Sequence, residues 1–385
     1  MSVFGSNLGW MQLRHQKVRT AVALMGIAFA VILVFMQLGF RTSLFESAVR
    51  YHERFNYDIA IVSTESRFIV DPQSFSSRRL YQALGIEGVA SVARVYVDQA
   101  IWKNPWDYSM QAVLVLGVDP DEDVLRTPGV ADGLDRIRQR DVILFDAHTR
   151  PEHGPVADRF RAGERVETEV NNRRVVIGGL YELGTSFGID GNILTSEDNF
   201  LRLYPGRPRS QIDLGLVRLL PGEDPVQVRD AIAAVLPQDV LVLTQAEFID
   251  REVAYWDATT PIGYVFAFGA VMGFVVGAII VYQILFADVS DHLAEYATLK
   301  AMGYSNRFVS GVVIQQAVIL AVLGFFPGLA ACVWLYGQAG AATRLPMYMT
   351  WERGIAVLLL TMTMCALSGM IALRKVRALD PADIF

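Results

Sequence analysis

Four long stretches of apolar residues divide the chain: residues 20–40, 262–287, 312–336 and 354–373. A helix needs about 20 mostly apolar residues to cross a lipid bilayer, and each stretch is long enough for that. None of the four contains Asp, Glu, Lys or Arg, which are costly inside a bilayer. A single stretch of this kind is also compatible with a buried core helix, but four without an internal charge favour four transmembrane helices.

The segment between the first two stretches, residues 41–261, alternates short apolar runs with polar ones, which is typical of strands. The runs that indicate strands are Tyr57–Val62, Ala112–Val118, Asp141–Phe145 and Arg165–Ile177. Asn171-Asn172 interrupts the last run as a two-residue hairpin turn. Residues 214–219, 226–236 and 240–243 have the pattern strand, helix, strand, and Asp224-Pro225 provides the N-cap and first position of that helix. We therefore predict a mixed α/β domain between the first and second transmembrane helices.

Both ends of this segment are expected to be helical. Residues 41–55 continue the first span with apolar residues at helical spacing, and Thr244-Gln245-Ala246-Glu247 has the form of a capping box that opens a helix towards Trp256. Because a helix continuous with a span is a stiff rod, this pair is a candidate stalk. Two ordinary surface helices are an equally good interpretation.

Basic residues flank the spans asymmetrically. Three precede the first span and three follow the last, namely Arg14, Lys17, Arg19, Arg374, Lys375 and Arg377. The positive-inside rule then places both termini in the cytoplasm. We predict that the four spans lie in the inner (plasma) membrane. The chain order becomes a cytoplasmic N-terminus (1–19), the first span (20–40), a periplasmic domain (41–261), the second span (262–287), a cytoplasmic loop (288–311), the third span (312–336), a short periplasmic loop (337–353), the fourth span (354–373) and a cytoplasmic C-terminus (374–385). A cleaved signal peptide is the alternative for the first span, but its apolar part is longer than usual and no A-x-A-like site follows it.

Composition agrees with a membrane protein. The 385 residues are 52% hydrophobic and 19% charged, with a net charge of -6. That charge and the lack of a basic stripe argue against a nucleic-acid partner. The two cysteines, Cys332 and Cys365, lie in apolar stretches, so the predicted domain has no thiol and cannot be held by disulfides.

The sequence contains no recognisable catalytic motif, and we predict no enzyme activity, cofactor or metal site in this chain. A Walker A loop needs Gly-Lys-Ser/Thr, but none of the four lysines follows a glycine. The nearest approach to a metal cluster is Asp146, His148, Glu152 and His153, which more often would be solvated polar residues. The charge-free spans also disfavour an ion-coupled carrier.

Small residues mark places where helices approach closely. Gly269, Gly273 and Gly277 repeat at intervals of four in the second span and predict tight packing against another helix, in this chain or a second copy. In the third span Pro327 lies between Gly324 and Gly328, so a kink or break is expected there.

The cytoplasmic loop begins with acidic residues and ends with a lysine and a glycine. This order suits the helix dipole and a glycine C-cap, so residues 288–303 predict a short amphipathic helix that a partner protein could seat in a groove. A helix lying on lipid headgroups is the alternative, but such helices are usually rich in Lys and Arg. The residues that we predict to couple to the partner are Asp291, Leu293, Glu295, Tyr296, Leu299, Lys300 and Gly303.

These loop residues also carry a resemblance to a known family. The pattern Glu295-x-x-x-Leu299-Lys300-Ala301-x-Gly303 resembles the signature between the second and third spans of MacB/FtsX-type ABC permeases, whose order of one span, a large outer domain and three spans is similar. The chain resembles the DevC permeases of cyanobacteria more closely still. The segments concerned are Phe45–Arg50, Trp102–Pro105, Gly179–Phe187, Asp288–Gly303 and Asp380–Phe385.

The resemblance implies a permease of the mechanotransmission class (type VII) that forms a homodimer and binds a separate, DevA-like ATPase, which would hold ATP and Mg²⁺. It also implies a DevB-like membrane-fusion protein and a TolC-like outer-membrane duct, with export of a lipid, glycolipid or other envelope substrate. Asp291 and His292 depart from the family, since many MacB-type members have arginines there. Two alternatives stay open: an FtsX-like regulator of a cell-wall hydrolase that transports nothing, and a LolC-like permease that releases lipoproteins.

Overall fold

The computed structural model describes residues 17–292 except Phe187, then Glu295, Thr298, Met302 and residues 304–377. The chain divides into two compact units. The helical unit comprises Met1–Ser43, Pro261–Thr343 and Met347–Phe385, and the sheet unit comprises Leu44–Thr260 with Arg344–Pro346.

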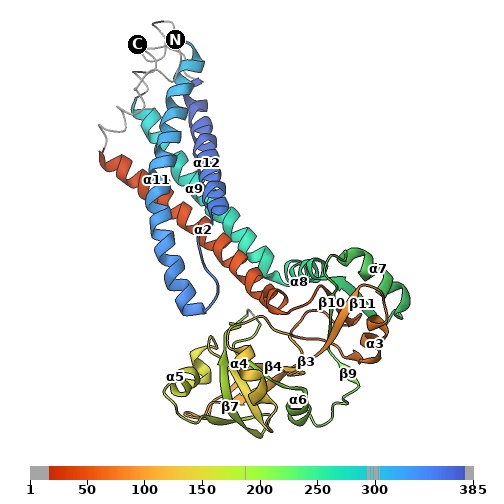
Figure 1. The fold of residues 1–385 in the computed structure, drawn as a ribbon. Helices are drawn as coiled ribbons and strands as arrows, with labels where there is room; N and C mark the ends of the chain where they lie inside the picture. Colours follow the sequence, from red (N-terminus) through yellow and green to blue (C-terminus); the bar gives the residue numbers. More distant parts are fainter. Residues whose placement is uncertain are drawn as a thin grey trace. The chain divides into compact units, whose positions relative to one another are not determined.

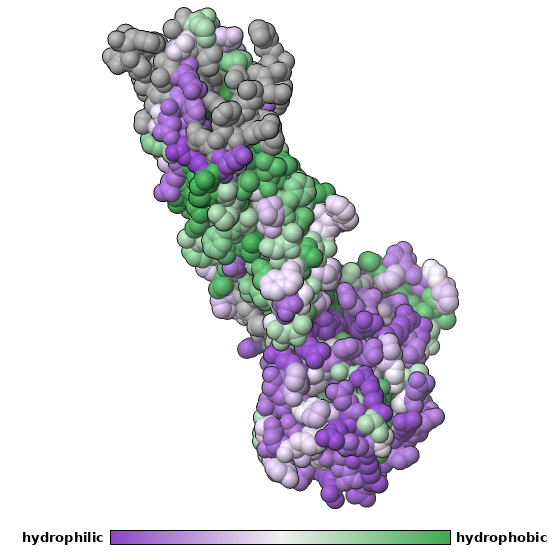
Figure 2. All heavy atoms as spheres, turned by 90° about the vertical axis from the view of Figure 1, so that its left-hand side faces the viewer, coloured by the Kyte–Doolittle hydropathy of each residue, from purple (hydrophilic) through white to green (hydrophobic). Residues whose placement is uncertain are grey.

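Four long helices build the helical unit: α2 (Lys17–Arg54), α9 (Pro261–Asp291), α11 (Asn306–Thr343) and α12 (Trp351–Arg377). Each is long and apolar enough to cross a membrane, as the sequence predicts. Their shared core contains Ile27 and Phe35 of α2, Leu320 and Phe325 of α11, and other side chains from α9 and α12. The four helices lie side by side in Figure 1, and Figure 2 shows hydrophobic side chains along their outer face, where lipid would contact them.

The sheet unit is built on nine strands in the order β11-β1-β10-β3-β4-β8-β5-β7-β6. Their bounds are β1 (Ile59–Ser63), β3 (Val89–Lys103), β4 (Met110–Val118), β5 (Val142–Asp146), β6 (Glu167–Val170), β7 (Arg173–Tyr181), β8 (Asn192–Ser196), β10 (Leu214–Leu219) and β11 (Val240–Thr244). Strand β6, at the end of this order, also pairs with β3. The six strands β3-β4-β8-β5-β7-β6 therefore form a closed ring. The pairs β4–β8 and β5–β7 are parallel, and the other pairs are antiparallel. A small second sheet joins β2 (Phe75–Ser76) to β9 (Gln211–Ile212).

Helices cover both faces of the large sheet (Figure 1). They are α3 (Arg78–Leu84), α4 (Val130–Ile137), α5 (Val156–Arg161), α6 (Glu197–Leu203), α7 (Pro225–Val235) and α8 (Gln245–Thr259), with a 3-10 turn at Pro151–His153. One core contains side chains of α3, α5, α6 and α7, and the other contains those of α4 and α8. The second core also contains Tyr51 and Phe55, so the last turns of α2 and the residue just after it pack on the same face as α8.

Local sequence signals account for several of these elements. Asn171 and Asn172 both have positive φ, 47° and 62°, which is the geometry of a tight two-residue turn between β6 and β7. The predicted strand-helix-strand unit is β10, α7 and β11, with the Asp224 side chain accepting a hydrogen bond from the Val226 amide. Thr244 and Glu247 form the predicted capping box at the start of α8. The mixed α/β prediction is confirmed.

Candidate functional site

The predicted coupling segment is described only in part. Asp291 is the last residue of α9, and Glu295 is exposed and helical. The other predicted coupling residues lie outside the described residues: Leu293, Tyr296, Leu299, Lys300 and Gly303.

Asp291 makes a specific contact with the first membrane helix. Its Oδ2 atom lies 2.5 Å from Nη1 of Arg19, near the beginning of α2. The next residue, His292, places Nδ1 2.9 Å from the backbone oxygen of Asp288, one turn back on α9. The end of α9, where the coupling segment begins, is therefore tied to the beginning of α2.

The three predicted packing glycines of α9, Gly269, Gly273 and Gly277, face other helices of the same chain. A Cβ atom on Gly273 would lie 3.3 Å from Cβ of Leu33 on α2, and one on Gly277 would lie 2.6 Å from Cβ of Ala30. A Cβ on Gly269 would meet the end of the Gln37 side chain. Close backbone approach of α9 to α2 thus depends on small residues.

Helix α11 packs against α2 in the same way. A Cβ on Gly324 would come within 2.7 Å of the Ile27 side chain, and one on Gly328 within 2.8 Å of Val31. Pro327 lies between them inside α11, and the helix continues through it, so the expected kink stays a prediction. Glycines of two helices therefore enclose α2 on two sides.

The last turns of α2 are anchored in the sheet unit. Nη1 of Arg50 donates a hydrogen bond of 2.8 Å to the backbone oxygen of Thr185, in the loop after β7. The hydroxyl of the buried Tyr51 donates one of 2.6 Å to Oδ1 of Asn192, at the start of β8. Because α2 is one continuous helix, these bonds connect a membrane-spanning helix to the sheet.

Asp146, at the end of β5, holds in place the loop and the Asn192 side chain that accept hydrogen bonds from Arg50 and Tyr51 of α2. Its fully buried carboxylate accepts hydrogen bonds from the amides of Leu183 (3.2 Å) and Gly184 (2.7 Å) and from Nδ2 of Asn192 (2.9 Å). These bonds satisfy a buried charge and hold the loop in place. None of these hydrogen bonds involves α2, but the negative charge of Asp146 also acts directly on Arg50 and Tyr51.

Two of the four residues closest to a metal-binding pattern in the sequence, Asp146 and His153, have other partners. Asp146 serves the loop, His148 is exposed, and Nε2 of His153 lies 3.1 Å from the Ala112 oxygen. Burial lowers the pKa of His153 and keeps its ring neutral. Across the residues that the structure describes, no three such side chains gather in a way that suits a metal ion.

Helix α8 meets α2 through a second buried contact. Nε2 of His52, on α2, lies 3.4 Å from Oε2 of Glu252, on α8. Nε2 of Gln245 donates to the backbone oxygen of His52 at 3.0 Å. The two helices that the sequence suggests as a stalk are therefore joined to each other within the sheet unit.

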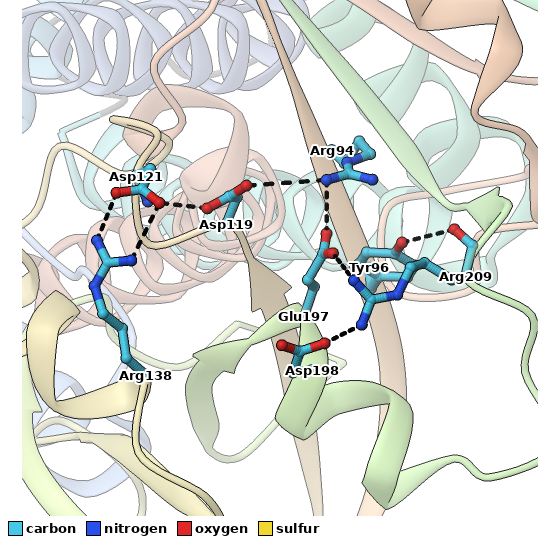
Figure 3. A network of polar contacts seen from close by, with 8 residues as sticks. All are labelled: Arg94, Tyr96, Asp119, Asp121, Arg138, Glu197, Asp198 and Arg209. Atoms are coloured by element: carbon cyan, nitrogen blue, oxygen red, sulfur yellow. Dashed lines mark hydrogen bonds and ion pairs between the residues drawn. The ribbon is translucent and has the colours of Figure 1, made fainter.

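A third polar cluster lies where the long strand β3 passes between its neighbours (Figure 3). Arg94 lies 3.2 Å from Glu197 and 3.9 Å from Asp119, and Arg209 also pairs with Glu197. Burial raises the pKa of Glu197, although both arginines favour its charged form. Nearby Glu122 has its pKa raised to about 7 by burial and by Asp119. This cluster links β3 to α6 and to the segments that contain Asp119 and Arg209, within the sheet unit.

The sequence does not predict the anchor residues Tyr51, His52, Asn192 and Glu252, and it indicates Asp146 only as part of the nearest approach to a metal cluster. A signal exists for two of them: His52 follows Ala48, and Glu252 follows Phe248, each by one helical turn on an apolar face. A polar residue on a buried helical face marks a specific contact. The others are brought together only by the fold.

Two family models match the chain. The model of the MacB-like periplasmic core domain matches residues 20–235, and that of the FtsX-like permease C-terminal region matches residues 267–381. Relatives include uncharacterised ABC transporter permeases of Mycobacterium bovis and Mycobacterium tuberculosis, each 26% identical over 295 residues, which are 68% of this chain and 76% of theirs.

Two solved structures have a distant likeness. The periplasmic region of MacB from Actinobacillus actinomycetemcomitans has a TM-score of 0.37 and 13% identity, over 51% of this chain and 92% of that one. The extracellular domain of the transporter YknZ from Gram-positive bacteria has a TM-score of 0.34 and 12% identity, over 49% and 99%. The assignment rests on the family models, the first of which covers more than half of the residues. The protein belongs to the MacB/FtsX family of ABC transporter permeases.

Proposed function

We propose that this chain is the permease subunit of a tripartite ABC exporter and that it relays the work of a separate ATPase to its periplasmic domain. The observation that carries the proposal is helix α2, which contacts the coupling segment at one end and is anchored in the sheet unit at the other. Arg19 pairs with Asp291, and Arg50 and Tyr51 bind the loop after β7 and the start of β8.

A continuous helix suits such a relay. At 1.5 Å per residue, the 38 residues of α2 extend over about 57 Å. The close glycine contacts with α9 and α11 let these helices act on α2 without soft intervening side chains. Force applied to the coupling segment would thus reach Arg50, Tyr51 and His52.

An ABC permease works with an ATPase. In the proposed complex this ATPase is a separate, DevA-like subunit that binds ATP and Mg²⁺, because none of the four lysines of this chain stands in a Walker A loop. Two copies of the permease, a DevB-like fusion protein and a TolC-like duct complete the exporter. The cargo is a lipid, a glycolipid or another envelope substrate taken up from the periplasm.

Reconstitution tests the proposal. The permease would be purified with its partner ATPase, and ATP hydrolysis would be measured with the wild type and with Glu295→Ala. Loss of stimulation with normal assembly supports the relay, whereas unchanged stimulation removes the coupling segment from the mechanism.

Co-purification from the native membrane tests the rest of the complex. A fusion protein and a duct support export. Recovery of a cell-wall hydrolase would instead support the FtsX-like alternative, and a periplasmic lipoprotein carrier would support the LolC-like one.

A further inference from the structure

A buried histidine and a buried glutamate face each other where α2 meets α8. His52 and Glu252 are 0% and 2% exposed, and their Nε2 and Oε2 atoms are 3.4 Å apart. Phe248, one turn before Glu252, places its ring against the edge of the imidazole, with centroids 4.3 Å apart and planes at 81°. Water therefore has little access to the pair.

Glu252 joins three parts of the sheet unit. Besides facing His52, it accepts a hydrogen bond of 3.1 Å from the amide of Ile69, in the segment after β1. It accepts another of 3.0 Å from Nε1 of Trp256, on α8 itself. The carboxylate is thus held in place whether or not the imidazole is charged.

His52 is less well satisfied. Neither ring nitrogen has a hydrogen-bond partner in the part of the chain that the structure describes. A protonated ring would give the buried carboxylate a charged partner, whereas a neutral ring could offer it only a neutral N–H beside the two neutral donors that it already has. If α2 and α8 separate, water reaches both groups and this difference shrinks. Protonation of His52 and closure of the contact are therefore thermodynamically linked.

Four other ionisable side chains lie around the contact: Tyr57, Arg251, Arg67 and Asp213. Tyr57, whose hydroxyl is buried, has its pKa raised by burial and by Glu252, so it stays neutral. Arg251 donates to the backbone oxygen of Ser66 at 2.7 Å. Exposed Arg67 and buried Asp213 line the apolar pocket that Phe248 and Glu252 also line.

Asp213 is the neighbour whose titration must be separated from that of the pair. It binds Arg207 and Ser74, and burial raises its pKa to about 6. A variant at this position therefore belongs in the test.

We propose that His52 and Glu252 form a proton-dependent latch between α2 and α8, closed when the imidazole is charged and loosened when it is neutral. The latch regulates the relay and rests on the proposed function, since it matters for transport only if these two helices move relative to each other. The latch can be measured in the permease alone, without the ATPase.

The test uses the full chain alone in lipid nanodiscs. Nitroxide labels at the exposed positions Glu53 (α2) and Ala254 (α8) report the helix separation through dipolar broadening at pH 6 and pH 8, a range in which histidines commonly change charge. We expect strong broadening at pH 6 that weakens at pH 8. The response should vanish in His52→Gln and Glu252→Gln, and it should persist in Asp213→Asn and in His148→Gln, which changes an exposed histidine.

A second measurement on the wild type guards against misfolding of the variants. Nitrogen-15 spectra of the five histidine rings, with His52 assigned by its loss in His52→Gln, should show an imidazolium at pH 6 and a neutral ring at pH 8. A ring with the same charge at both pH values overturns the latch. So does a helix separation that ignores pH, or one that still responds in His52→Gln. Failure of ATPase coupling in the reconstituted complex would refute the proposed function alone, because the latch is measured without the ATPase.

Discussion

The guanidinium group of Arg50 occupies the space that a side chain at position 184 would need. A Cβ atom on Gly184 would overlap Nη1 of Arg50, and Gly184 has φ of +91°. Glycine at this position therefore suits both the left-handed backbone of the loop after β7 and the close approach of Arg50.

Replacing this glycine should loosen the anchor. In Gly184→Ala the methyl group strains the backbone and displaces Arg50 from the Thr185 oxygen, and we expect a loss of roughly 2–4 kcal/mol in unfolding free energy. Urea unfolding of the purified chain in detergent measures it. Gly163→Ala is the matched control, because Gly163 has φ of +83° but no atom lies within 4 Å of the place that its methyl group would take. Equal losses in the two variants would show that the contact with Arg50 contributes nothing.

The close packing at Gly273 of α9 predicts a loss of stability when this residue is enlarged. Gly273→Val should destabilise the helical unit by roughly 1–3 kcal/mol, because the backbone of α2 and Leu33 leave no room for a branched side chain. Gly337→Val, on α11, should have little effect, since nothing lies within 4 Å there. Thermal unfolding in detergent compares the two variants. Similar melting temperatures for both would argue against close packing of α9 on α2.

Much of the architecture follows from local patterns. The four spans are evident because long apolar stretches without charges are typical of membrane helices. The turn at Asn171-Asn172 is evident because asparagine tolerates positive φ. The capping box at Thr244 is equally local. Such features depend on residues a few positions apart, so a sequence displays them directly.

The pairing of the strands could not be predicted in this way. Strand β3 is 15 residues long and pairs with β10, β4 and β6, which lie at very different distances along the chain. The anchor has the same property: Tyr51 and Asn192 are 141 positions apart. The sequence indicates this anchor only through His52 and Glu252, two polar residues on otherwise apolar helical faces.

Two acidic side chains of the sheet unit, Glu122 and Asp213, predict a stability that depends on pH. The pKa of Glu122 is raised to about 7 and that of Asp213 to about 6, both chiefly by burial. The native state therefore binds more protons than the unfolded chain between about pH 5 and pH 7, so these groups stabilise the fold as pH falls and destabilise it as pH rises through their pKa values.

Glu122→Gln isolates one of these groups, because its side chain cannot ionise. We expect the variant to be more stable than the wild type at pH 8 by on the order of 1 kcal/mol, since Glu122 is partly exposed, and to match it at pH 5. Denaturant unfolding at the two pH values measures the difference. Glu87→Gln, at an exposed position, is the control and should show no such change. A Glu122→Gln variant that is less stable at pH 8 would contradict the assigned direction.

The pair Arg19–Asp291 predicts a separation of coupling from stability. Both side chains are partly exposed, 38% and 54%, so the pair contributes at most about 1 kcal/mol to stability. Asp291→Asn and Arg19→Gln should therefore leave the melting temperature nearly unchanged. If the pair transmits force from the coupling segment to α2, each variant should nonetheless reduce stimulation of the partner ATPase severalfold. The exchange Arg19→Asp with Asp291→Arg should restore part of the stimulation, because it rebuilds the ion pair with opposite polarity.

The control for this prediction is Asp121→Asn, which breaks the exposed pair with Arg138 in the sheet unit and should leave stimulation of the ATPase intact. If the single variants couple normally, α2 is driven through its packing contacts with α9 and α11 instead, and Gly273→Val becomes the variant that should uncouple the complex.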